Sequence, residues 1–246
     1  MNAINSLSLA QIVKTNHKAG NVFEKYHLDF CCKGKRSLEQ ACAEQQLPLA
    51  DVMTELQDVF ASNDKPVGPD FENMKLSELT GYIVSTHHSY VKTEMPQIYT
   101  WLQKVASKHG ERHPELYKIY EMFCAVKEEM EMHMKKEEMI LFPRLNELQK
   151  IAESDNSSLQ VNITYLQGPI TVMEQEHDYA GNKMNEIRLL SSDYTPPADA
   201  CTTYQLSFAA LNAFEIDLHQ HVHLENNILF PKALGVFNSL RSGSLN

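Results

Sequence analysis

The stretch HMKKEEMILFP at residues 133–143 recurs, 88 positions further along the chain, as HVHLENNILFP at residues 221–231. In each copy a histidine is followed four residues later by a glutamate: His133 by Glu137, and His221 by Glu225. Residues four apart lie one turn apart on the same face of an α-helix, so each copy presents an imidazole beside a carboxylate. Such a pair offers two metal ligands from one helix.

The surrounding hydrophobic residues predict that this face points inward. Val126 and Met130 precede the first pair and Ile140 follows it, at the three- and four-residue spacing of a buried helical face. The second copy repeats the pattern. A histidine and a glutamate therefore stand where a helical core would take leucine. Burying them without partners costs free energy, so something must compensate.

Two more histidines extend the repeat, because His88 precedes the first motif by 45 residues and His177 precedes the second by 44. Both lie on apolar helical faces. A histidine in such a place is usually an ordinary core residue, and only the duplicated coincidence favours metal binding. His87 competes with His88, since it is in phase with Ile83 and Tyr90. Periodicity alone leaves both histidines open.

Four imidazoles and two carboxylates are too many ligands for one tetrahedral zinc ion. Two metal ions bridged by the two glutamates would use all six. Iron accepts this mixed nitrogen and oxygen set, whereas calcium and magnesium prefer oxygen. The residues therefore predict a non-haem di-iron centre, and ligand type alone leaves manganese or a mixed pair open.

Composition narrows the functional classes. The 246-residue chain is 43% hydrophobic, carries a net charge of −10 and has five cysteines. The acidic balance argues against nucleic acid or an anionic membrane as partner. We find no long apolar run and no secretory signal, so we expect a cytoplasmic protein without a membrane span or a disulfide scaffold.

The helical periodicity and the absence of strand-like alternation predict an all-α protein. A stretch with two prolines, a glycine and short polar residues predicts a break near residue 65. We expect a small helical domain at 1–62, a linker at 63–74 and a four-helix bundle at 75–246. The expected helices span roughly 8–26, 37–46, 48–60, 75–108, 113–149, 169–191 and 200–239.

Adjacent cysteines give the first domain a second signal. Cys31 and Cys32 lie in the stretch DFCCKGK at residues 29–35. Neighbouring cysteines rarely form a relaxed disulfide with each other, but they can act in thiol exchange or bind a soft metal ion. The alternative that one of them is simply a buried apolar residue stays open.

Taken together, these motifs resemble the repair-of-iron-centres family of bacterial di-iron proteins, also called the ScdA type. The resemblance covers nearly the whole chain and is carried by DFCCKGKRSL at 29–38, EHDYAG at 176–181 and the two repeated stretches. It implies a hemerythrin-like up-down four-helix bundle behind a short cysteine-containing domain.

The resemblance also implies a ligand set and a cofactor. It favours His88 over His87, because His88 stands eight residues before Pro96. Two non-haem irons, with oxo and carboxylate bridges, would be bound by His88, His133, His177 and His221 and bridged by Glu137 and Glu225. Glu129 and Glu176 would lie near the metal entrance.

The function implied by the resemblance is repair of iron-sulfur clusters damaged by oxidative or nitrosative stress, through iron donation rather than enzymatic turnover. Its partners would be damaged iron-sulfur proteins or cluster scaffold proteins, with nitric oxide or oxygen as small ligands and a homodimer left open. A second hypothesis is reversible binding or sensing of oxygen or nitric oxide, as in hemerythrin. An oxidase of the ferritin type is disfavoured, because those sites use more carboxylates and a Glu-x-x-His spacing.

Overall fold

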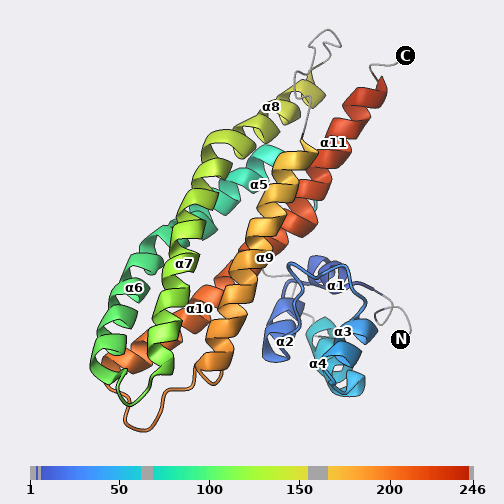
Figure 1. The fold of residues 1–246 in the computed structure, drawn as a ribbon. Coiled ribbons are helices and arrows are strands. Elements are labelled where there is room, and N and C mark those ends of the chain that lie inside the picture. Colours follow the sequence, from blue (N-terminus) through green and yellow to red (C-terminus); the bar gives the residue numbers. More distant parts are fainter. Residues whose placement is uncertain (1–3, 5–6, 62–68, 155–165, 244–246) are drawn as a thin grey trace. The chain divides into compact units, whose positions relative to one another are not determined.

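The computed structural model describes residues 4, 7–61, 69–154 and 166–243 (Figure 1). These residues are predominantly helical and contain no β-strand, apart from an isolated antiparallel bridge between Ser8 and Ser37. The predicted all-α class is therefore confirmed. Residues 63–68 of the predicted linker lie outside the described ranges. No helix in the described ranges combines the length and the apolar character needed to cross a membrane.

The chain divides into two compact units, residues 1–74 with 219–231, and residues 75–218 with 232–246. In the first unit, two helices begin with reciprocal capping boxes, in which a serine and the glutamine three residues on bond each other's backbone N–H. Leucine, phenylalanine and other apolar residues from all its helices form a core of its own. Its helices are α1 (Leu9–Thr15), α2 (Ala19–Lys25), α3 (Leu38–Glu44) and α4 (Leu49–Ala61).

One expected helix, 8–26, is in fact two. The helix α1 ends at Thr15, and the backbone of the next residue, Asn16, is extended with φ −151° and ψ 110°. The Asn16 side chain then accepts a hydrogen bond from the backbone N–H of Lys18 at 3.0 Å. An asparagine that bonds the backbone two residues on offers a turn in place of another helical residue, which explains the break.

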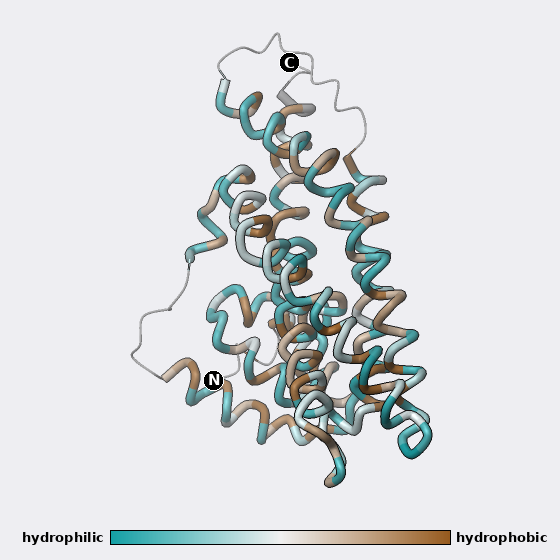
Figure 2. The backbone as a smooth tube through the Cα atoms, turned by 90° about the vertical axis from the view of Figure 1, so that its left-hand side faces the viewer, coloured by the Kyte–Doolittle hydropathy of each residue, from teal (hydrophilic) through white to brown (hydrophobic). Residues whose placement is uncertain are grey.

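The second unit is made of long helices that continue through short π-helical segments. The helices α6 and α7 lie side by side, as do α7 and α9 and, near one end, α5 and α8 (Figure 1). Polar and apolar residues alternate along these helices (Figure 2), as expected where one face is buried. The elements from residue 75 onward are, in chain order, α5 (Leu76–Ile83), η1 (Val84–His88), α6 (Ser89–His109), α7 (Glu115–Lys136), η2 (Glu137–Leu141), α8 (Phe142–Glu153), α9 (Gln167–Leu190), α10 (Thr202–Leu224), η3 (Glu225–Leu229) and α11 (Phe230–Gly243). Residues 219–231, which form the end of α10, all of η3 and the start of α11, belong to the first unit.

Aromatic and aliphatic side chains fill the space between these helices. The rings of Phe123 on α7 and Phe214 on α10 meet edge to face, with centroids 5.6 Å apart, and both side chains are completely buried. In the same unit, the Tyr194 hydroxyl donates to the buried carboxylate of Glu215 at 3.0 Å. This core holds the helices rigidly enough to position polar side chains in the interior.

Candidate metal centre

Each repeated motif places its glutamate at the start of a π-helical segment. The segment η2 begins at Glu137 and η3 begins at Glu225, so the π-helices recur with the sequence repeat. A third one, η1, ends at His88. A π-helical turn accommodates one extra residue and is often found at functional sites. Three of the predicted ligands therefore lie at the edges of such turns.

The π-helical turn η2 corrects the predicted helical face of the first motif, whereas Ile228 in the second motif is buried as expected. Ile140 was expected to be buried in phase with Glu137, but its side chain is 49% exposed. Leu141, one residue later, is buried instead. The reason is the extra residue in η2, which rotates everything after Glu137 relative to an ideal α-helix. Pro143 lies in the first turn of α8, where proline is tolerated.

Within the second unit, three predicted ligands converge on one point of the interior. The Nε2 atoms of His133 and His177 are 3.1 Å apart. An Oε2 atom of Glu137 lies 3.3 Å from the Nε2 atom of His133. None of these three side chains is exposed, and their ligand atoms lie close enough to share one metal ion. Dry, converging nitrogen and oxygen donors of this kind fit a transition-metal ion such as iron.

His88 joins the same carboxylate from another helix. Its Nε2 atom is 3.3 Å from Oε2 of Glu137, and its side chain is also fully buried. One carboxylate thus faces two imidazoles from different helices. His87, the competing residue, directs its Nδ1 atom to Asp217 at 2.9 Å. The structure therefore brings His88, rather than His87, against Glu137.

Two further carboxylates contact the Nδ1 atoms of these imidazoles and so orient the rings. Nδ1 of His88 lies 2.8 Å from Oε1 of Glu138, and Nδ1 of His133 lies 2.9 Å from Oε2 of Glu176. A carboxylate at Nδ1 favours the tautomer with the proton on that atom, which leaves the lone pair of Nε2 facing inward. Sequence reasoning missed Glu138. Glu176 was predicted to lie near the metal entrance, but the residue that it contacts was not predicted.

Lysines keep these two outer carboxylates ionised. Burial opposes the ionisation of Glu138, but hydrogen bonds from Lys92 and His88 outweigh it and hold the pKa of Glu138 below its usual value. Burial likewise opposes the ionisation of Glu176, and bonds from His133 and Lys136 likewise lower its pKa. Both acceptors are therefore charged at neutral pH, as a ligand-orienting carboxylate must be.

The second motif lies in the first compact unit, on the helical segment 219–231. His221 and Glu225 are fully buried, and Nε2 of His221 lies 3.0 Å from Oε1 of Glu225. The imidazole and carboxylate are therefore side by side, as the four-residue spacing predicts. The arrangement repeats what His133 and Glu137 show in the other unit.

The opposite side of that segment contacts the amino-terminal helices and loop. His219 pairs with Glu24 at 2.9 Å, and Asn227 donates to the carbonyl of Cys31 at 3.0 Å. His223, between them, faces the carbonyl of Phe30 at 3.5 Å. These positions are four residues apart and form one stripe, which their i, i+4 spacing in the sequence could have indicated. Sequence reasoning left His219 and His223 without a role.

The remaining predicted residues are placed as follows. Glu129 is half-buried on α7, one turn before His133, and no hydrogen bond or ion pair is recorded for it within the described ranges. Cys31 is buried and Cys32 is partly exposed, and both are free thiols. Their Sγ atoms are 3.9 Å apart.

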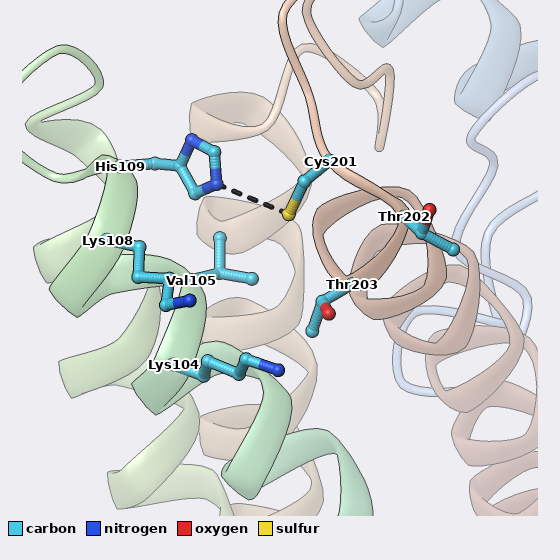
Figure 3. A pocket seen from close by; sticks show the side chains of 7 residues that line it. All are labelled: Lys104, Val105, Lys108, His109, Cys201, Thr202 and Thr203. Atoms are coloured by element: carbon cyan, nitrogen blue, oxygen red, sulfur yellow. Dashed lines mark hydrogen bonds between the residues drawn. The ribbon is translucent and has the colours of Figure 1, made fainter.

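An open pocket of about 290 Å³ lies elsewhere on the second unit, between the end of α6 and the start of α10 (Figure 3). His109 and Cys201 face each other across it, with Nε2 3.3 Å from Sγ. Lys104 and Lys108 line the same pocket from α6. None of the predicted metal ligands is among its lining residues, so this pocket is separate from the candidate centre.

Comparison with known proteins covers both parts of the chain. Residues 81–233 match the hemerythrin HHE cation-binding domain, and residues 5–59 match ScdA_N, a domain of unknown function. The iron-sulfur cluster repair protein YtfE of Musicola paradisiaca is 32% identical over 92% of this chain and 96% of its own length. A probable iron-sulfur cluster repair protein of Haemophilus influenzae is 33% identical, and YtfE of Edwardsiella ictaluri is 34% identical, with the same coverage.

Proposed function

The chain belongs to the family of iron-sulfur cluster repair proteins with a hemerythrin HHE cation-binding domain, and we propose that it repairs damaged clusters by donating iron from a di-iron centre. The observation that carries the proposal is the convergence of His133, Glu137 and His177 in an interior closed to water. Buried groups of this kind are costly unless a cation or another partner compensates them.

We propose that the centre takes six ligands, with one glutamate from each motif as a bridge. The chain supports this by its two equivalent motifs, each with a buried histidine and glutamate and a π-helical turn at the same place. The contact of Glu137 with imidazoles from two helices suits a bridging carboxylate. The ligands are His88, His133, His177, His221, Glu137 and Glu225.

In this proposal the protein controls how firmly iron is held. Two bound irons would supply a redox-dependent affinity, stronger in the oxidised state. Glu138 and Glu176 keep His88 and His133 oriented, and Lys92 and Lys136 keep those carboxylates charged. Movement of the Glu137 or Glu225 carboxylate away from its imidazole neighbour would open the site for release of the iron that is to be donated. The acceptor is a damaged iron-sulfur protein or a cluster scaffold protein.

The amino-terminal thiols favour repair over simple carriage of oxygen. A reversible carrier of oxygen or nitric oxide needs the buried centre alone, whereas this chain also holds two free thiols, Cys31 and Cys32, in a separate helical unit. Free cysteines are typical of a reducing compartment, so we place the protein in the cytoplasm.

Transfer of labelled iron tests the proposal. The full chain is loaded anaerobically with isotopically labelled ferrous iron and mixed with a cluster protein damaged by nitric oxide. We expect label in the restored cluster above the level given by equal free ferrous iron. Glu137→Gln should reduce loading and transfer, whereas Glu121→Gln, an exposed acid on the same helix, should not. Unchanged iron content over repeated cycles of gas binding, with no transfer, would support the hemerythrin-like alternative instead.

A further inference from the structure

A second group of potential metal ligands lies in the loop between α2 and α3. Asp29, Cys31 and Cys32 each offer one ligand atom, and these atoms lie within 4.8 Å of one another. The Sγ atom of Cys31 is 3.3 Å from Oδ1 of Asp29 and 3.9 Å from Sγ of Cys32. The group lies wholly within the first compact unit and contains none of the ligands proposed for the iron centre.

These separations fit a single tetrahedral ion. A zinc-like ion binds sulfur at about 2.3 Å and oxygen at about 2.0 Å, so tetrahedral angles place two sulfurs roughly 3.8 Å apart and sulfur and oxygen roughly 3.5 Å apart. The observed distances of 3.9 Å and 3.3 Å differ from these by a few tenths of an ångström at most. Little movement is needed to close the three ligands around one ion.

Backbone hydrogen bonds hold the ligands in this arrangement. Oδ1 of Asp29 accepts from the backbone N–H groups of Cys31, Cys32 and Lys33, at 3.2, 2.9 and 3.2 Å. Three such bonds fix the position of the carboxylate relative to the loop backbone. The loop is therefore folded around Asp29, with both Sγ atoms within 4.8 Å of a carboxylate oxygen.

Close packing behind the loop fixes its path. At Gly34 an added Cβ would lie 2.2 Å from the carbonyl oxygen of Phe30 and 2.9 Å from Cβ of Ala10, so only glycine fits. The Gly34 carbonyl accepts from the N–H of Ala10 at 2.9 Å. Asn227 holds the carbonyl of Cys31 from the other side. Ligands that are already positioned bind a metal ion with a smaller loss of conformational entropy.

We propose that Asp29, Cys31 and Cys32 form a second, mononuclear metal site for a thiophilic divalent cation, such as ferrous iron or zinc. Three protein ligands leave the fourth tetrahedral position for solvent or an incoming thiolate, as in metal sites that exchange ligands. Cys32 is partly exposed, which gives the ion a route to solvent.

Metal binding at this site releases two protons. A thiol must lose its proton to bind a metal ion, so binding through Cys31 and Cys32 displaces the proton of each thiol. The ion replaces the proton that Cys31 shares with Asp29 and the proton of Cys32, and both protons pass to solvent. No electron is transferred and the metal keeps its charge.

The site stands without the proposed repair function, and its role in that function is a separate step. Thiolates are the usual protein ligands of iron-sulfur clusters. An iron ion held by Cys31 and Cys32 would already have part of that ligand set. If the protein donates iron, as proposed above, this site is suited to present the ion to a thiol-bearing acceptor.

Cobalt(II) is the probe that separates this site from the buried centre. Thiolate bound to cobalt(II) gives an intense charge-transfer band in the near ultraviolet, and the histidine and glutamate ligands of the other centre contain no sulfur. The full-length reduced protein is titrated anaerobically with cobalt(II). We expect a thiolate band that saturates at one ion per chain, together with release of two protons.

Three variants decide the result. Cys32→Ser, at a partly exposed position where loss of folding is not expected, should weaken the binding seen by this band at least about tenfold. Asp29→Asn should weaken it while leaving both thiols in place. Cys201→Ser, which removes an exposed thiol on the other unit, should leave the band unchanged. Absence of the band in the wild type, its persistence in Cys32→Ser or its loss in Cys201→Ser would each overturn the proposal. None of these outcomes depends on iron transfer.

Discussion

Removing Glu138 should weaken iron binding although this residue is not among the proposed ligands. Glu138 directly follows Glu137, one of the two proposed bridging ligands, and its carboxylate accepts from Nδ1 of His88 at 2.8 Å. The substitution Glu138→Ala leaves His88 free to rotate and to move its proton to Nε2. An imidazole protonated at Nε2 has no lone pair to offer the metal ion.

The size of the effect follows from the kind of contact. Loss of a carboxylate behind a ligating histidine typically weakens metal binding about 10- to 100-fold, which corresponds to roughly 1.4 to 2.7 kcal/mol. The side chain of Glu138 is 29% exposed, so water can partly replace the lost acceptor. We therefore expect a value near the lower end, about tenfold. Glu176 is only 15% exposed, and Glu176→Ala should cost more through His133.

The measurement is an anaerobic titration of the metal-free protein with ferrous iron in competition with a chelator of known affinity. Glu138→Gln retains an acceptor oxygen for Nδ1 and should lose less affinity than Glu138→Ala. Glu121→Gln provides an exposed control on α7. Thermal unfolding of each metal-free variant separates a loss of affinity from a loss of folding. Wild-type affinity in Glu138→Ala, or equal losses in the alanine and glutamine variants, would refute the orientation argument.

Three further predictions concern the rest of the molecule. Asn227→Ala removes a hydrogen bond to the Cys31 carbonyl that is worth about 1 kcal/mol. Alkylation of the Cys32 thiol should therefore become about fivefold faster. An unchanged alkylation rate would show that Asn227 does not hold the loop. Burial lowers the pKa of His17, against the raising effects of the Pro69 carbonyl and nearby acids. The unfolded chain therefore binds this proton more readily than the folded chain. The contribution of His17 to the free energy of unfolding should be fully present above pH 6.5, the ordinary pKa of histidine, and should be lost as the pH drops below it. His17→Gln should reduce that loss in chemical denaturation, and an identical pH profile would contradict the assignment. Ser192 is exposed and has φ 51°, a conformation that favours glycine. Ser192→Gly should therefore raise the free energy of unfolding by roughly 0.5 to 1 kcal/mol and the Tm by about 2 °C. A lower Tm would show that the backbone at Ser192 is not strained.

The residue types of the candidate site and their shared helical face could largely be predicted from local sequence. A four-residue spacing determines that His133 and Glu137 share a helical face, and flanking apolar residues indicate that the face is inward. The duplication supplied the second pair, and both pairs are buried as expected. The all-α class followed from the same periodicity.

The π-helical turns were decided only by the tertiary structure. The α-helical pattern left both His87 and His88 open, and the structure, with the π-helical segment η1 ending at His88, brings His88 against Glu137. The extra residue in η2 exposes Ile140. A π-helical turn forgoes ideal local hydrogen bonding, so local propensity does not predict it; packing and polar contacts from other helices must stabilise it.

Contacts between distant segments were equally hidden from the sequence. Nothing near Glu138 indicates that it pairs with His88, 50 residues earlier, or that Asn227 holds the carbonyl of Cys31. The sequence by itself therefore determined which candidate ligands the chain offers and which helices carry them, because those properties repeat with the helical turn. Tertiary packing alone decided which atom of each ligand faces inward and how the thiol loop is held, because those depend on side chains brought together from distant parts of the chain.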